Sequence, residues 1–168
     1  MSGSGRPPRA AWLAFFGLAA AVVVADQLVK AWIVPRFPLG EPVPVFGDLL
    51  RIWLIHNNGA LFGLFRDQAI LFAAGSIAVI GLIVWFHPRA VVSHGALATL
   101  ALGLLLGGAI GNLIDRVRLG YVIDFVDIGI GGWRFYTFNV ADAAISTSLL
   151  LLVLMAFLPG RRPAGAVA

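Results

Sequence analysis

The sequence contains no cysteine. This absence excludes disulfide bonds, thiolate nucleophiles and thiolate metal sites. Histidine is scarce as well, and the spacing of His56, His87 and His94 is not that of a metal site. We therefore predict that the protein uses neither a metal nor another cofactor.

Charge is also sparse. Only 12% of the 168 residues are charged, whereas about a quarter are charged in a typical soluble domain. The chain is 60% hydrophobic, and its mean hydropathy is +0.95. This composition predicts a membrane protein. The basic residues are scattered rather than gathered in one stripe, which excludes an ordinary nucleic-acid-binding surface.

Four apolar segments are each about long enough to cross a hydrocarbon core of about 30 Å as a helix. We predict one all-α membrane domain over residues 1–168, with four transmembrane helices and a small extracytoplasmic sheet. The helices are expected at about 10–33, 68–86, 95–114 and 139–158, with the second closed by His87-Pro88.

The distribution of arginine predicts the orientation. The two tails and the short second connection contain five arginines and no acid. The two longer connections contain six arginines and six acids over a greater length. Because positive charge favours the cytoplasmic side, both termini are expected in the cytoplasm and both long connections outside.

The first segment has an alternative interpretation as a cleavable signal peptide, because small residues stand at Val23 and Ala25 after a basic start. Asp26 and Lys30 favour a retained helix instead. They are spaced i, i+4 on a helix that continues through Ile33. In that helix Lys30 is expected to extend to the membrane interface.

The connection at 34–67 predicts the small sheet. Val43–Phe46 and Leu50–Ile55 are candidate strands, and "HNNG" is a candidate turn. We expect this region, about 38–65, to lie on the membrane surface, with the apolar side chains near its end at the lipid boundary. These side chains are Phe62, Leu64 and Phe65.

The polar residues of the four segments gather at what would be one membrane face. They are Asp26, Lys30, Asn112, Asp115, Arg116, Asn139 and Asp142. Asn139 and Asp142 are spaced i, i+3 and share a helix face. A carboxylate that enters a membrane helix costs a few kcal/mol or more, so Asp142 requires a functional or structural reason.

Several of these residues also have simpler explanations. Asn139 suits a helix N-cap, Asp115 and Arg116 suit interface charges, and Asp127 suits a solvated loop acid. Gly107, Gly108 and Gly111 suit close helix packing. Such explanations are weakest for Asp142 and for Asp124, which lies within the apolar stretch "YVIDFV".

Two carboxylates at a partly dry site share a proton, so one can act as a general base and the other as a general acid. This chemistry fits an aspartic protease. It equally fits a proton-coupled transporter that uses the same acids as a relay, and a structural scaffold is a third class. The apolar midplanes of all four segments and the absence of a sequence repeat count against a transporter.

Five stretches of the chain resemble, in order, the lipoprotein signal peptidases (signal peptidase II). They are "DQLVK" (26–30), "NNGALFGLF" (57–65), "GGAIGNLIDR" (107–116), "GYVIDFVDI" (120–128) and "FNVADAAIS" (138–146). The resemblance implies an aspartic endopeptidase of the bacterial inner membrane, surrounded by membrane lipids, and we expect it to be monomeric. It implies cleavage of prolipoproteins just before the lipid-modified lipobox cysteine.

The resemblance also implies roles for individual residues. The catalytic aspartates correspond to Asp124 and Asp142. The supporting positions correspond to Asp26, Lys30, Asn57, Gly59, Ala60, Gly108, Asn112, Arg116 and Asn139. Residues 38–65 correspond to a small β-cradle and a half-helix on the outer face.

Overall fold

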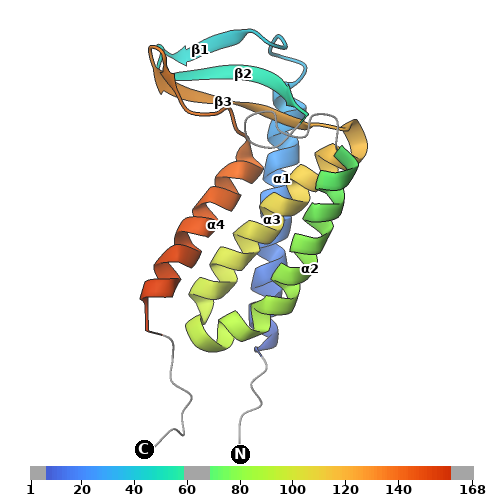
Figure 1. The fold of residues 1–168 in the computed structure, drawn as a ribbon, viewed down its shortest axis with the longest axis vertical. Helices are drawn as coiled ribbons and strands as arrows, with labels where there is room; N and C mark the ends of the chain where they lie inside the picture. Colours follow the sequence, from blue (N-terminus) through green and yellow to red (C-terminus); the bar gives the residue numbers. More distant parts are fainter. Residues whose placement is uncertain (1–6, 59–68, 160–168) are drawn as a thin grey trace, which may run out of the picture.

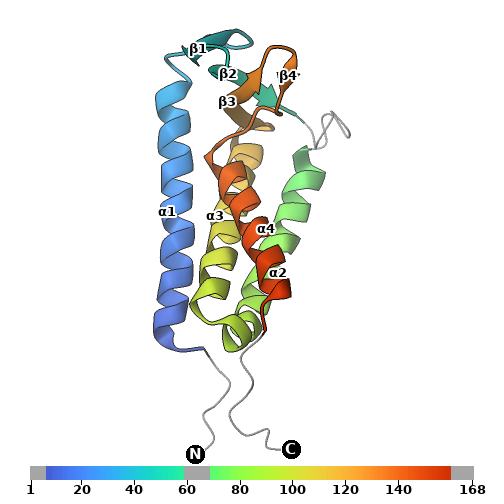
Figure 2. The same ribbon diagram turned by 90° about the vertical axis from the view of Figure 1, so that its left-hand side faces the viewer.

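The computed structural model describes residues 7–58 and 69–159. Four helices form a bundle, and a small sheet covers one end of it (Figure 1). The start of α1 and the end of α4 lie at the opposite end (Figures 1 and 2). The helices are α1 (Arg9–Ile33), α2 (Ala69–His94), α3 (Ala96–Leu119) and α4 (Val140–Phe157). Each is long and apolar enough to cross a membrane, as the sequence predicted.

Helix α3 is the central helix of the bundle. Of its membrane-length window 61% is buried, against 22% for each of the other three helices. Small residues allow this close packing. A Cβ atom added at Gly107 would lie 2.6 Å from Val22 Cβ on α1, and one at Gly108 would lie 2.5 Å from the Ala141 carbonyl oxygen on α4.

The sheet is antiparallel, with strand order β1-β2-β3-β4. Its strands are β1 (Pro42–Phe46), β2 (Leu50–Asn57), β3 (Val122–Ile130) and β4 (Trp133–Arg134). The predicted sheet between the first two helices is therefore confirmed, but half of its strands come from the connection between α3 and α4. A cluster of buried apolar side chains supports the sheet where it meets α1, and it is formed by Ile33, Leu54, Ile123 and Phe125.

The predicted end of the second helix at His87-Pro88 is wrong, because α2 continues to His94 with Pro88 inside it. A proline removes one backbone hydrogen bond, and burial of the flanking residues offsets that loss here. The His87 ring is fully buried and lies 4.1 Å from the Phe15 ring, and Ala90 is also buried. The break comes at Gly95, where φ is +60°.

Helix α3 likewise extends beyond the predicted end at Ile114. It ends at Leu119 and is capped by Gly120, whose φ of +82° is the left-handed conformation that glycine tolerates. The added turn carries Asp115 and Arg116 on the helix itself. Several predicted features fall outside the described residues. These are the half-helix, Gly59, Ala60, Phe62, Leu64 and Phe65.

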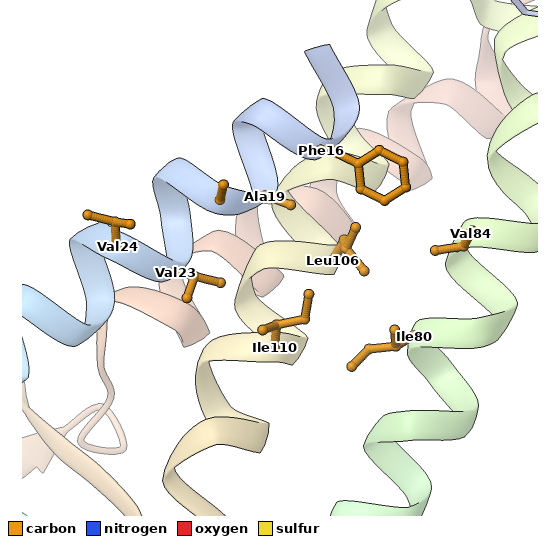
Figure 3. A pocket seen from close by; sticks show the side chains of 9 residues that line it. Phe16, Ala19, Val23, Val24, Ile80, Val84, Leu106 and Ile110 are labelled. Carbon is orange, nitrogen blue, oxygen red and sulfur yellow. The ribbon is translucent and has the colours of Figure 1, made fainter. Parts of the chain in front are cut away.

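An apolar groove of about 400 Å³ lies among α1, α2 and α3. Figure 3 shows Leu106 and Ile110 of α3 facing Ile80 and Val84 of α2 across it. Its lining consists of Phe16, Ala19, Ala20, Val23, Val24, Ile80, Val84, Leu106 and Ile110. Such walls suit hydrocarbon and supply no group for acid–base chemistry.

Candidate active site

Asp124 and Asp142 are brought to one place by Asn139. The Asn139 side-chain Nδ2 donates to Asp124 Oδ1 over 2.7 Å, and its backbone N–H donates to Asp142 Oδ2 over 3.2 Å. Asp124 comes from β3 and is fully buried, whereas Asp142 comes from the first turn of α4 and is half-buried. One residue therefore contacts both carboxylates.

The local sequence explains why α4 starts here. Asn139 is the N-cap, and its side-chain oxygen accepts a 2.8 Å hydrogen bond from the Asp142 N–H. The Asp142 carboxylate in turn accepts from the Asn139 backbone, which completes a capping box. The simple N-cap interpretation of Asn139 is thus confirmed. The same capping geometry fixes the Asp142 carboxylate beside the helix N-terminus, where negative charge is favoured.

Two further asparagines orient the carboxylates. Asn112 Nδ2 donates to Asp142 Oδ1 over 2.7 Å, and Asn57 Nδ2 donates to Asp124 Oδ2 over 2.9 Å. Asn112 Oδ1 also accepts from Asn139 Nδ2 over 3.1 Å. The three amides thus come from β2, α3 and the start of α4, and they converge on the two acids.

The environment of Asp124 favours its neutral form. Burial is the larger cause, the nearby negative charge of Asp142 is the second, and together they raise the pKa of Asp124 to about 7. Two carboxylates held in this way can carry one proton between them near neutral pH. One can then act as a base and the other as an acid.

A second polar cluster adjoins these residues. Lys30 Nζ lies 2.8 Å from Asp26 Oδ2 and 2.6 Å from Asp115 Oδ2. The i, i+4 spacing of Asp26 and Lys30 thus brings the two side chains into an ion pair. The predicted extension of Lys30 to the interface is wrong, because its side chain is only 3% exposed and binds two acids inside the protein. Asp115 is equally buried, so it is not a plain interface charge.

The interpretation of Asp127 as a solvated loop acid is also wrong. Asp127 is fully buried in β3, 2.6 Å from Arg51 and 2.7 Å from Arg134. Burial alone would raise the pKa of this carboxyl, but hydrogen bonds from Arg134 and Arg51 outweigh burial and lower it. The spacing of Asp124 and Asp127 in the sequence could have indicated this. Residues 124 and 127 lie on opposite faces of a strand, so Asp127 belongs to a separate cluster that ties β2, β3 and β4 together.

Two further predicted residues, Arg116 and Gly108, lie beside Asn112 and α4 respectively. Arg116 Nη1 donates to the Asn112 carbonyl oxygen over 3.3 Å, and its guanidinium lies 5.5 Å from the centre of the Phe72 ring. Gly108 contacts α4 and allows it to approach α3. Within residues 7–58 and 69–159, no group of three or more His, Cys, Asp or Glu side chains could hold a metal ion.

Sequence reasoning did not single out Gln27. Its Nε2 donates to Asp26 Oδ2 over 3.1 Å and to Asp115 Oδ1 over 2.9 Å. It stands directly after Asp26 near the end of an apolar helix, and a polar amide in that position could have indicated a buried partner.

Comparison with known proteins places the chain in a family. Residues 18–158 match the family described as Signal peptidase (SPase) II. The chain is 41% identical to the lipoprotein signal peptidase of Geobacillus kaustophilus, over 86% of this chain and 94% of that protein. It is also 41% identical to that of Caulobacter vibrioides, over 89% of each.

A solved structure described as a bacterial membrane enzyme has the same fold. It superimposes with a TM-score of 0.78 at 31% identity, over 84% of this chain and 86% of that one. The chain therefore belongs to the signal peptidase II family of membrane proteases.

Proposed function

We propose that this protein is an aspartic endopeptidase that removes the signal peptide from prolipoproteins carrying a diacylglyceryl group. Cleavage occurs just before the lipidated lipobox cysteine. The observation that carries the proposal is the contact of Asn139 with both Asp124 and Asp142. The names of the relatives, lipoprotein signal peptidases, support the substrate class.

In the proposed reaction the two aspartates share one proton. The ionised carboxylate takes a proton from a water molecule, and the resulting hydroxyl attacks the scissile carbonyl carbon. The protonated carboxyl then gives its proton to the amide nitrogen as the C–N bond breaks. The products are a free carboxyl end on the signal peptide and a free amine on the lipidated cysteine. The pKa of Asp124, about 7, suits this exchange at neutral pH.

The polar residues around the dyad have supporting roles in this proposal. Asn57, Asn112 and Asn139 hold the carboxylates in position. Arg116, Gly108, Gly59 and Ala60 contribute to the substrate-binding region, and Asp26 and Lys30 support the site from α1.

The proposed location follows from the same arrangement. Asp124 lies in β3 and Asp142 in the first turn of α4. These elements meet at the end of the bundle away from the start of α1 and the end of α4 (Figure 1). The arginine distribution favours cytoplasmic termini, so the site faces the extracytoplasmic side of the bacterial inner membrane. A diacylglyceryl chain anchored in the outer leaflet would present its cysteine at that level. The protein acts as a monomer and as one domain.

The alternative was a proton-coupled transporter. Family membership counts against it, and the dyad lies at a membrane boundary rather than at the midplane that transporters use. No observation in the described part of the chain favours a transporter.

The decisive experiment uses purified protein in detergent with a diacylglyceryl-modified prolipoprotein, and it follows signal-peptide release by gel electrophoresis. Asp124→Asn and Asp142→Asn should each abolish release, because asparagine preserves shape but cannot carry the proton. Glu41→Gln, which changes an exposed acid, is the matched control and should retain full activity. Near-normal release by either aspartate variant would remove that residue from the mechanism.

A further inference from the structure

Asp26 and Asp115, in the buried cluster beside the dyad, each accept a hydrogen bond from the residue that precedes one of the two proposed catalytic aspartates. Asp115 Oδ2 accepts a 3.1 Å hydrogen bond from the backbone N–H of Ile123, the residue before Asp124. Asp26 Oδ1 accepts a 3.0 Å hydrogen bond from the backbone N–H of Ala141, the residue before Asp142. Each non-catalytic carboxylate therefore binds the peptide group directly ahead of one dyad member.

The two carboxylates are themselves joined. Lys30 lies 2.8 Å from Asp26 and 2.6 Å from Asp115, and Gln27 donates to both. The path from Asp124 to Asp142 thus runs through Ile123, Asp115, Lys30, Asp26 and Ala141. The first and last links are peptide bonds, and every link between them is a hydrogen bond or an ion pair between buried groups.

The base of this path is rigid. Asp26 and Lys30 belong to α1 and Asp115 to α3, and these helices meet where Gly107 faces Val22 with no room for a side chain between them. Ile123 is fixed at its other end as well, because its carbonyl oxygen accepts a 3.2 Å bond from Asn139. Neither Asp124 nor Asp142 can shift without breaking a buried contact, which costs free energy when a partner is left unpaired.

We propose that Asp115 and Gln27 are positioning residues, which together with Asp26 and Lys30 set the separation of the two catalytic aspartates through the peptide groups that precede them. The inference rests on the proposed function, since it assumes that Asp124 and Asp142 act as a dyad. We name the four side chains the α1–α3 clamp. Its members act on the dyad through backbone atoms and do not touch the substrate.

Two substitutions at Asp115 distinguish the effect of the position of its side-chain oxygen from the effect of its negative charge. Asp115→Asn removes the charge and one acceptor of Gln27, whose Nε2 continues to donate to Asp26, but it leaves a carbonyl oxygen at the right distance from the Ile123 N–H. Asp115→Glu keeps the charge for Lys30 but displaces the carboxylate by one methylene. Because a misplacement of about 1 Å can cost about 100-fold in rate, Asp115→Glu should lose about 10- to 100-fold in kcat. Asp115→Asn should stay within about fivefold of the unmodified protein.

The assay uses the full-length protein in detergent, with kcat normalised to the folded fraction. Asp115→Ala, if it folds, should resemble Asp115→Glu, and KM should change less than twofold in all three variants. The pH at which the rate is half-maximal should move in Asp115→Glu, because the interaction between two carboxylates depends on their separation. Gln27→Leu, which removes one link, should show a smaller loss of kcat. Equal kcat in Asp115→Glu and the unmodified protein would overturn the proposal, as would a loss in Asp115→Asn as large as in Asp115→Glu.

Asp127→Asn is the matched control for loss of a buried, ion-paired acid. It lies on the same strand as Asp124, and its partners are Arg51 and Arg134 rather than the clamp. It should lower the melting temperature while kcat per folded molecule stays within about twofold, since distant sites act independently. A loss of kcat in Asp127→Asn equal to that in Asp115→Glu would show a general effect of strand damage and would overturn the clamp.

Asp124→Asn in the same assay distinguishes the two proposals. If Asp124→Asn retains activity, the proposed catalytic dyad is wrong, and the proposed role of the α1–α3 clamp is wrong as well. If it is inactive while Asp115→Glu has an unchanged kcat and pH profile, the dyad stands and only the clamp is wrong.

Discussion

Asn139 donates a 2.7 Å hydrogen bond to Asp124 while its own side-chain oxygen caps the helix on which Asp142 stands. One side chain therefore caps α4 with its oxygen and binds Asp124 with its nitrogen. The oxygen faces α4, and the nitrogen faces β3. A substitution can therefore remove the hydrogen bond to Asp124 and keep the helix cap.

Asn139→Ser should separate the effect of the helix cap from the effect of the hydrogen bond to Asp124. Serine caps a helix about as well as asparagine, so Asn139→Ser should keep the capping contribution to stability. Its melting temperature should fall only because the buried acceptors of the Asn139 amide lose their donor. Serine supplies no amide for Asp124, and a hydrogen bond to a charged group contributes about 1.5–3 kcal/mol. We therefore expect kcat to fall by about 10- to 100-fold. Asn139→Ala should lose both stability and rate. Full activity in Asn139→Ser, measured by signal-peptide release, would contradict a role at the dyad.

The rate of cleavage should fall as the pH rises through about 7. The pKa of Asp124 is raised from 3.8 to about 7 by burial and by the charge of Asp142. Above that value the pair loses the proton that the leaving amine requires. A pH–rate profile from pH 5 to 9 checks this, and a rate that is constant between pH 6 and 9 would contradict it.

The same shift predicts how stability depends on pH. Between about pH 4 and 7 the folded Asp124 keeps a proton that the unfolded chain has released, so stability should fall as the pH rises across that window. Asp124→Asn should flatten this part of the thermal-stability curve. An unchanged slope in that variant would mean that another group is responsible.

Lys30→Ala should lower thermal stability and leave partial activity. The substitution leaves Asp26 and Asp115 buried without their cation. Breaking a buried ion pair from one side costs about 3–5 kcal/mol. Arg118→Ala, at an exposed position of the same sheet-facing end, should change stability by less than about 0.5 kcal/mol. An unchanged melting temperature would mean that the ion pairs contribute no net stability. Complete loss of activity in stable Lys30→Ala protein would place Lys30 in the chemistry.

Chelation should not inhibit cleavage. The described residues offer no cluster of three or more metal-ligating side chains, and the proposed mechanism activates water with a carboxylate. Incubation with EDTA should leave the rate of signal-peptide release unchanged. Inhibition that zinc alone reverses would contradict the metal-free mechanism.

The helices were predictable because each needs only a local run of apolar residues of membrane length. Their ends were less predictable. Proline usually ends a helix, yet Pro88 stays inside α2 because tertiary packing around His87 offsets the missing hydrogen bond. Such packing joins residues far apart in the chain, and a local pattern carries no trace of it.

The candidate site shows the same division. Asn139 and Asp142 were recognisable together because they share one helix turn. The burial of Asp115 and Asp127 could not be recognised from the sequence, since it depends on partners that other helices and strands bring to each residue. The third and fourth strands were missed for a related reason: β3 pairs with β2 across the whole of α2 and α3, and no short-range signal reports that pairing.

The Asp26–Lys30 pair also bears on the order in which the protein is made. Translation delivers α1 first, and the Ala141 N–H that Asp26 binds lies 115 residues further along the chain. Lys30, one turn away, is the partner already present when α1 is inserted, so the helix can enter the membrane with its carboxylate neutralised. The completed network must wait for α3 and then for the first turn of α4. In the proposed mechanism, proteolytic competence therefore requires the last helix of the bundle, because α4 carries Asp142.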